Sequence, residues 1–305
     1  MTDTRYLTAL RVAFLVAVAV FAWYGLHGRL DEVGAALRAT SALGVAGAFV
    51  LVLLGLLATG FVWLRLMRVA GADLPLRDGL ATFFVGQLGK YIPGSVWSIG
   101  AQAQMAGRNS VPRRSTVAAG LLFLGYHVAT GVAASSVVVL VGGLAVPWPP
   151  GVTVLLFATS VLGLLPVVVR RAGSRVAGRQ VAVDLGDTLV LLALMAAAWS
   201  AYSVALVLLS PGRPWVDMAA FGGAFALAYA SGVVIVAAPA GFGAREALFV
   251  VLLTPLLGVP GATALALLAR VAHTAADGTM AAGWWYGAQA TRRRRGSGRP
   301  ATAPR

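Results

Sequence analysis

Apolar runs of about 20 residues alternate with short polar or basic stretches along most of the chain. A helix of about this length matches the hydrocarbon thickness of a bilayer. We therefore expect an all-α polytopic membrane protein, with residues 1–290 forming a single transmembrane domain. The apolar runs that predict spans are 6–26, 43–64, 116–144, 152–169, 188–209, 218–238, 247–259 and 262–288.

The segment 79–107 does not fit this simple alternation. It is largely apolar, yet it lies between two basic loops that belong on the same side of a membrane. Its centre reads GQLGKYIPG (86–94), and the Pro93-Gly94 pair ends any helix there. We expect a re-entrant hairpin, with one half-helix near 80–88 and a second from 95 to about 106. Irregular backbone at this depth needs cover from protein or from a water-filled cavity.

A second irregular segment, AAPAGFGARE (237–246), leaves two topologies open. If 218–238 and 247–259 both cross, the chain has about eight spans, and the length of 218–238 favours this arrangement. If they form a hairpin that enters from the other side, the chain has six spans and two inverted hairpins. The shortness of 247–259 and the inverted repeats common in transporters favour the second arrangement.

Composition and charge sharpen this picture. Hydrophobic residues make up 59% of the 305 residues and charged residues only 11%, which excludes a soluble enzyme. The net charge is +14, but 18 of the 24 Lys and Arg residues fall in loops or near span ends on one side of the predicted spans. The positive-inside rule then places both termini in the cytoplasm, and because most of the charge follows topology we expect no nucleic-acid partner. Residues 291–305 are basic and rich in Gly, Pro and Ser, which predicts a disordered cytoplasmic tail.

Both irregular segments combine a Pro and Gly break, a cation and the start of a following helix. Lys90 precedes one such helix and Arg245 lies in the first turn of the other. The free N–H groups and partial positive charge of a helix N-terminus attract anions, and an added cation suits phosphate. Glu246 is expected to cap its helix or to pair with Arg245. The alternative is that both cations are only interfacial anchors. The candidate headgroup-binding residues are Gln87, Lys90, Tyr91, Pro93, Gly94, Gly241, Gly243, Arg245 and Glu246.

Further polar residues lie within the predicted spans. Arg270, His273 and Asp277 share one face of the last span, either as an internal ion pair that holds helices together or as a secondary polar path. His127 is expected to be a hydrogen-bonded packing residue. Gln87, Gln102 and Gln104 either line a cavity of the first hairpin or satisfy broken backbone.

Several kinds of chemistry have no pattern in the sequence. Cysteine is absent, and no metal-ligand spacing, nucleotide-binding loop or Ser/His/Asp set is visible. We therefore expect no metal, no cofactor and no enzymatic activity.

The stretches GKYIPGSVW (89–97) and PAGFGARE (239–246) resemble the two signature stretches of the lysylphosphatidylglycerol synthase transmembrane region, a family also described as flippase-like. The resemblance implies translocation of a modified lipid between leaflets. The full synthase carries a soluble aminoacyltransferase domain after this region, whereas this sequence continues only into the basic tail.

These observations and the resemblance favour a flippase-like protein of the bacterial inner membrane for a phosphate-bearing lipid, either a phospholipid or a lipid-linked sugar. One alternative is a membrane-embedded transferase that uses a lipid-phosphate-linked donor, with Glu246 or Asp277 as its acid or base. Another is a non-catalytic subunit that forms a homo-oligomer or orients a separately encoded soluble transferase.

Overall fold

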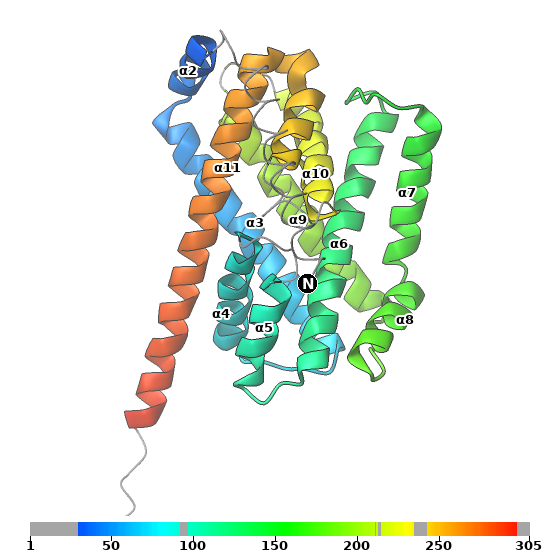
Figure 1. Ribbon diagram of the computed structural model, residues 1–305, viewed down its shortest axis with the longest axis vertical. Helices are drawn as coiled ribbons and strands as arrows, with labels where there is room; N and C mark the ends of the chain where they lie inside the picture. Colours follow the sequence, from blue (N-terminus) through cyan, green and yellow to red (C-terminus); the bar gives the residue numbers. More distant parts are fainter. Residues whose placement is uncertain (1–29, 92–96, 211, 213–214, 235–242, 298–305) are drawn as a thin grey trace, which may run out of the picture.

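The computed structural model describes residues 30–91, 97–210, 212, 215–234 and 243–297, and every element in these ranges is a helix (Figure 1). The predicted first span at 6–26 lies outside the described residues. The elements are α2 (Leu30–Ala39), α3 (Ala42–Val69), α4 (Leu76–Gln87), η1 (Leu88–Tyr91), α5 (Trp97–Gly107), α6 (Arg113–Leu140), α7 (Pro150–Leu164), α8 (Pro166–Ala177), α9 (Leu185–Leu208), η2 (Trp215–Asp217), α10 (Met218–Val234) and α11 (Ala244–Ser297).

The helices have the length and surface of a membrane bundle. Five helical stretches in the described residues are long and apolar enough to cross a membrane, and the number is six if the bent pair α7–α8 counts as one span. Large apolar side chains lie exposed on these helices, among them Leu54 at 54%, Leu155 at 63% and Val271 at 67%. Such a surface is unfavourable in water but not in hydrocarbon. The prediction of an all-α membrane protein is confirmed at this level.

Small residues allow the helices at the centre of the bundle to approach one another closely. A Cβ atom at Gly55 of α3 would lie 2.3 Å from the ring of Tyr202 on α9, so only glycine fits there. Large rings pack in the same core, where the ring centroid of Phe83 lies 5.6 Å from that of Trp63 and 5.2 Å from that of Phe123. The core thus combines close backbone approach with large buried rings.

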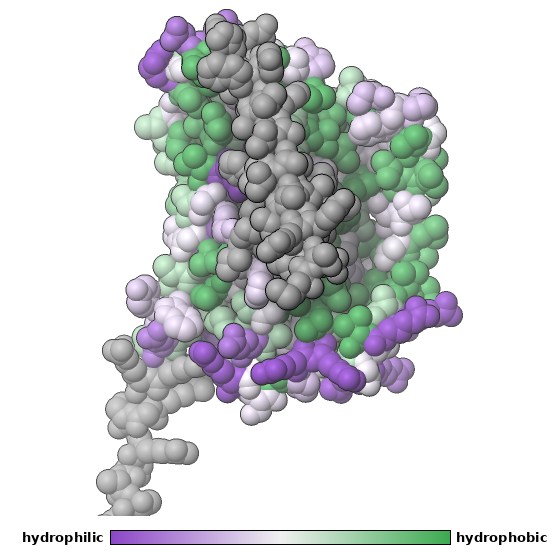
Figure 2. Space-filling model, viewed as in Figure 1, coloured by the Kyte–Doolittle hydropathy of each residue, from purple (hydrophilic) through white to green (hydrophobic). Residues whose placement is uncertain are grey.

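The predicted span 152–169 is wrong in one respect, because it is not a single straight helix. The helix is interrupted at Leu165, and α7 and α8 meet there at a bend of 64°. Pro166 has no N–H to donate and suits the first turn of a new helix. The short helix α8 carries Arg170, Arg171 and Arg175 at the lower end of the bundle, where Figure 2 shows hydrophilic side chains gathered along one edge.

The two last predicted spans are joined into α11, which bends sharply at Gly258. The backbone there has φ 66° and ψ 167°, a conformation that favours glycine. The part before Gly258 runs up beside α10, and the part after it runs down the whole bundle (Figure 1). The helix α11 continues to Ser297, seven residues into the predicted tail 291–305.

Two helical hairpins start from opposite ends of the bundle (Figure 1). In the first, α4 and η1 run antiparallel to α5, as the sequence predicts. A Cβ at Gly89 would lie 2.8 Å from the backbone nitrogen of Ser98, so the two arms touch through their backbones. In the second, α10 pairs with the part of α11 before Gly258. The ends of both hairpins reach the middle of the bundle.

Candidate functional site

A cavity of about 100 Å³ lies where the two hairpins meet. This volume holds on the order of three water molecules. The first hairpin, the second hairpin and the last half of α11 all contribute to its wall. The polar and charged side chains of these elements that line it are Gln87, Lys90, Tyr91, Ser98, Tyr229, Arg245, Arg270, His273, Thr274 and Asp277.

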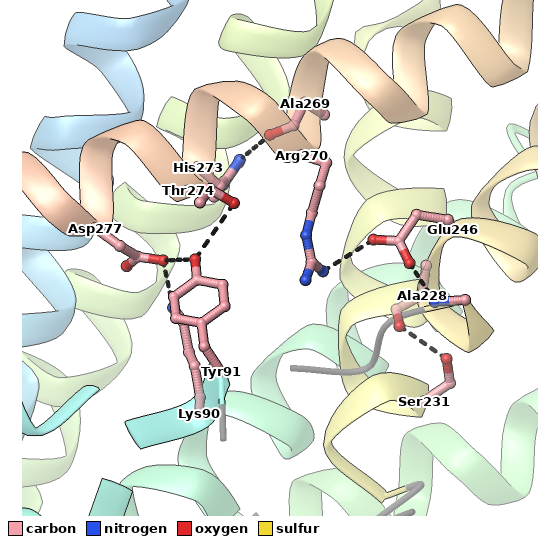
Figure 3. Close-up of polar contacts among 11 residues, drawn as sticks. Lys90, Tyr91, Ala228, Ser231, Glu246, Ala269, Arg270, His273, Thr274 and Asp277 are labelled. Atoms are coloured by element: carbon pink, nitrogen blue, oxygen red, sulfur yellow. Dashed lines mark hydrogen bonds and ion pairs between the residues drawn. The ribbon is translucent and has the colours of Figure 1, made fainter. Parts of the chain in front are cut away.

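The cation of the first hairpin is paired with a carboxylate (Figure 3). Lys90 Nζ lies 2.7 Å from Asp277 Oδ2, and the Tyr91 hydroxyl donates to the same oxygen at 2.7 Å. The Tyr91 hydroxyl also lies 3.4 Å from Thr274 Oγ1. The Asp277 side chain is only 4% exposed, so it needs this positive partner to stay charged at this depth. Asp277 therefore ties η1 to α11.

The carboxylate of the second hairpin is also paired. Glu246 Oε2 accepts a hydrogen bond from the backbone N–H of Gly243 at 2.8 Å, so the predicted helix cap is present. Its other oxygen, Oε1, lies 3.0 Å from Arg270 Nη1, so the ion-pair partner of Glu246 is Arg270 instead of Arg245 (Figure 3). The bend at Gly258 explains this partner, because it folds the second half of α11 back beside the first turn of the same helix.

Arg270 and Asp277 thus lie on one face of α11, as the sequence predicts, but each pairs with a different hairpin. Arg270 pairs with Glu246 of the second hairpin and Asp277 with Lys90 of the first. The second half of α11 therefore links the two hairpins through two separate ion pairs.

Arg245 has aromatic partners instead of a carboxylate. Its guanidinium carbon lies 4.6 Å from the ring centre of Phe225 and 5.0 Å from that of Tyr229. Ring faces attract a cation but do not neutralise it. Within the described ranges, Arg245 has no ion pair with an acidic side chain.

Among the residues that the structure describes, the charges around the cavity do not balance. Lys90, Arg245 and Arg270 supply three positive charges, and Asp277 and Glu246 supply two negative ones. The adjoining loop sequences 92–96 and 235–242 contain no charged residue. Within the described part of the chain, one positive charge is left over, and it is centred on Arg245. Charge buried among apolar helices is costly unless it is paired, which makes this place suited to an anion.

Two buried histidines also face the cavity. His127 is 4% exposed and stacks on Tyr229 with ring centres 4.6 Å apart. Within the described ranges neither of its ring nitrogens has a hydrogen-bond partner, although the sequence predicted one. His273 is 7% exposed; its Nδ1 lies 2.8 Å from the carbonyl of Ala269, and its Nε2 lacks a partner there. Unsatisfied buried nitrogens beside a polar cavity are typical of a place for water or a ligand.

The structure brings most of the sequence-predicted residues together. Pro93, Gly94 and Gly241 lie outside the described residues. Of the three glutamines, only Gln87 lines the cavity. Gln102 is 1% exposed and packs against Gly86, and Gln104 lies near Arg108 on another surface.

Sequence reasoning missed the aromatic side chains around Arg245. Tyr202 and Tyr229 line the cavity, and Phe225 lies against the Arg245 guanidinium. An aromatic residue within an apolar helix is ordinary in a membrane span, so no local signal distinguishes these three. Their role depends on which helices pack together.

Comparison with known proteins does not assign the chain to a family. No family model matches the chain, and no curated protein matches it. The resemblance of the two loops to the flippase-like family therefore stays a prediction. The fold and the site define an all-α membrane protein with a charged cavity between two opposed helical hairpins.

Proposed function

We propose that this chain is a flippase-like membrane protein that binds the phosphate-bearing headgroup of a lipid and translocates it between leaflets. The observation that carries the proposal is the unbalanced positive charge at Arg245, at the meeting point of two helical hairpins. Two further features support it: the unsatisfied histidine nitrogens beside the cavity and the apolar exterior of the bundle.

The topology that we propose has six crossings and two re-entrant hairpins from opposite sides. The crossings are the sequence-predicted span 6–26, α3, α6, α7 with α8, α9, and α11 after Gly258. The bend at Gly258 and the antiparallel course of α10 and early α11 favour this arrangement over eight crossings (Figure 1). The basic end of the bundle then faces the cytoplasm.

In the proposed mechanism, the headgroup passes through the polar cavity while its hydrocarbon chains stay in an apolar environment. Arg245 attracts the phosphate, and Lys90 is the second cation within the same cavity. Discontinuous helices that present charged ends to an anion near the bilayer midplane are a common transporter design. Each ion pair with α11 holds one hairpin in position while the headgroup is bound.

Lipid scrambling in proteoliposomes tests the proposal. Purified protein is reconstituted with a fluorescent phospholipid, and a membrane-impermeant quencher is added outside the vesicles. Scrambling is followed as the loss of fluorescence from inner-leaflet lipid, which is protected until it reaches the outer leaflet. We expect the wild type to scramble faster than empty vesicles, and Arg245→Ala and Lys90→Ala to approach the empty-vesicle rate. Arg171→Ala, which removes an exposed cation from α8, is the matched control and is expected to keep the wild-type rate. Equal rates in wild type, variants and empty vesicles would contradict translocation.

The same preparations distinguish the transferase alternative. Its candidate acid or base residues, Asp277 and Glu246, are both held in ion pairs with cations. Turnover of a lipid-phosphate-linked sugar donor by the purified protein, without scrambling, would replace the flippase proposal with the transferase.

A further inference from the structure

A second hollow in the bundle lies close to the charged cavity but has a different lining. It is a groove of about 460 Å³ between α6, α9 and α10, closed at one side by Leu164 of α7. Small residues leave most of the space, among them Ala133, Ala134, Ala196, Ala219, Gly222 and Gly223. Ala134 and Ala196 are exposed, so the groove opens on the outer, apolar surface of the helices.

Two of the three hydroxyl groups that line this groove, those of Thr130 and Ser203, are hydrogen-bonded within the protein, and the third, Ser200, is exposed. Thr130 donates to the carbonyl of Tyr126 at 2.6 Å and accepts from Trp199 Nε1 at 3.1 Å. Ser203 donates to the carbonyl of Trp199 at 2.8 Å. Hydroxyl groups that are hydrogen-bonded within their own helices do not need a polar partner in the groove. The groove therefore offers an apolar surface, in contrast to the charged cavity.

Only one helical turn separates the groove from the cavity. On each of three helices, one residue that lines the groove and one residue that lines the cavity are three positions apart. Three positions along a helix correspond to about 5 Å. The pairs, with the groove residue first, are Thr130 and His127, Trp199 and Tyr202, and Ala226 and Tyr229.

Trp199 forms the partition between the two spaces. Its ring lies 5.1 Å from the ring of His127 and 6.0 Å from that of Tyr229, both of which face the cavity. A Cβ at Gly131 would lie 2.9 Å from the same indole, so α6 is pressed against it. An apolar space and a cationic space on either side of one side chain match the two chemical halves of an anionic lipid.

We propose that the groove holds one hydrocarbon chain of the lipid whose phosphate lies at Arg245. This inference rests on the proposed function, because it takes the headgroup site as given. A chain that leaves the bilayer for the groove exchanges one apolar environment for another, so the fit of the chain to the small-residue walls decides its binding. The site then selects for amphiphiles, and a water-soluble phosphate uses only half of it.

The experiment uses full-length protein in phosphatidylcholine vesicles that contain phosphatidylglycerol with a diazirine midway along one chain. After illumination, the labelled residues are located by mass spectrometry. We expect the label to concentrate on the groove faces of α6, α9 and α10. Ala196→Phe, which fills the groove from an exposed position, is expected to lower this labelling at least about fivefold. Ala197→Phe is the matched control, because Ala197 is also exposed on α9 but does not line the groove.

A second experiment tests whether the groove and the charged cavity hold parts of the same lipid. Arg245→Ala is expected to lower groove labelling by the phosphatidylglycerol probe and to leave labelling by diacylglycerol with the same diazirine chain unchanged. Label spread evenly over all lipid-facing helices, or equal groove labelling in Ala196→Phe and wild type, would overturn the inference.

Failure of the groove and failure of translocation give different results. Specific groove labelling in a protein that does not scramble lipids supports the chain site and contradicts the proposed function. Scrambling at the wild-type rate in Ala196→Phe, without groove labelling, supports the function and contradicts the chain site.

Discussion

The two hairpins are built from the same parts but treat their cations differently. Each has a break at Pro and Gly residues and brings one basic side chain to the central cavity. Lys90 of the first hairpin lies 2.7 Å from Asp277, whereas Arg245 of the second lies against the rings of Phe225 and Tyr229. The first cation is neutralised and fixed, and the second keeps its charge available.

The comparison separates two roles that a cation at membrane depth can have. A buried ion pair holds an element in place, because removing one partner leaves the other charge unsatisfied. A cation held by aromatic faces costs less to leave without a carboxylate and stays able to bind an anion. We therefore expect the first hairpin to contribute more to stability, and Arg245 to contribute more to ligand binding.

The largest loss of stability is expected for Asp277→Ala. The change leaves Lys90 without a counter-charge and the Tyr91 hydroxyl without an acceptor. Breaking a buried pair in this way costs about 3–5 kcal/mol, and the 25% exposure of the Lys90 side chain favours the lower end. Thermal unfolding in detergent measures the effect. The double variant Lys90→Met/Asp277→Leu removes both charges and is expected to recover most of the loss; equal stability of Asp277→Ala and wild type would contradict the fixed role of the pair.

Glu246→Ala is expected to cost less, about 2 kcal/mol. It removes a helix cap worth about 1 kcal/mol and a partly exposed ion pair with Arg270 worth at most about 1 kcal/mol. The same unfolding assay measures it. Glu246→Gln keeps an oxygen that can accept from Gly243 and is expected to lose only the ion-pair part. A loss for Glu246→Ala that exceeds that of Asp277→Ala would reverse the ranking of the two hairpins.

Arg245→Ala is expected to lower stability by only about 1 kcal/mol, the order of one cation–π contact, while it lowers the scrambling rate at least about tenfold. Stability and transport are measured on one preparation. Arg245→Lys restores the charge and is expected to recover part of the rate. If Arg245→Ala unfolds as readily as Asp277→Ala, the distinction between a fixed and an available cation fails.

The smallest effect is expected for Arg171→Ala on α8. This side chain is exposed at the basic end of the bundle, and such substitutions change stability by less than about 0.5 kcal/mol. Both the unfolding temperature and the scrambling rate are expected to match the wild type. A lower scrambling rate would extend the functional surface from the cavity to this end of the bundle.

Local signals in the sequence were enough to find the first hairpin and the residues that carry charge. Basic loops on both sides of 79–107 and the break at Pro93-Gly94 predicted two half-helices, and the structure has them at Leu76–Gln87 and Trp97–Gly107. Local signals left the course of the chain after residue 218 open. The length of 218–238 favoured a crossing and the shortness of 247–259 favoured a hairpin, whereas the antiparallel course of α10 and early α11 and the bend at Gly258 are visible only in the structure.

The sequence by itself determined that the protein is an all-α bundle with an apolar exterior, and that Lys90, Arg245, Arg270 and Asp277 are its unusual charges. These properties follow from length, hydropathy and spacing, which are local. Only the tertiary structure decided the pairing: Lys90 with Asp277, Arg270 with Glu246, and Arg245 with two aromatic rings. The partners of the two ion pairs, 187 and 24 positions apart, meet only because α11 folds back and runs past both hairpins. Which cation stays available to a ligand is therefore a property of packing, not of any single segment.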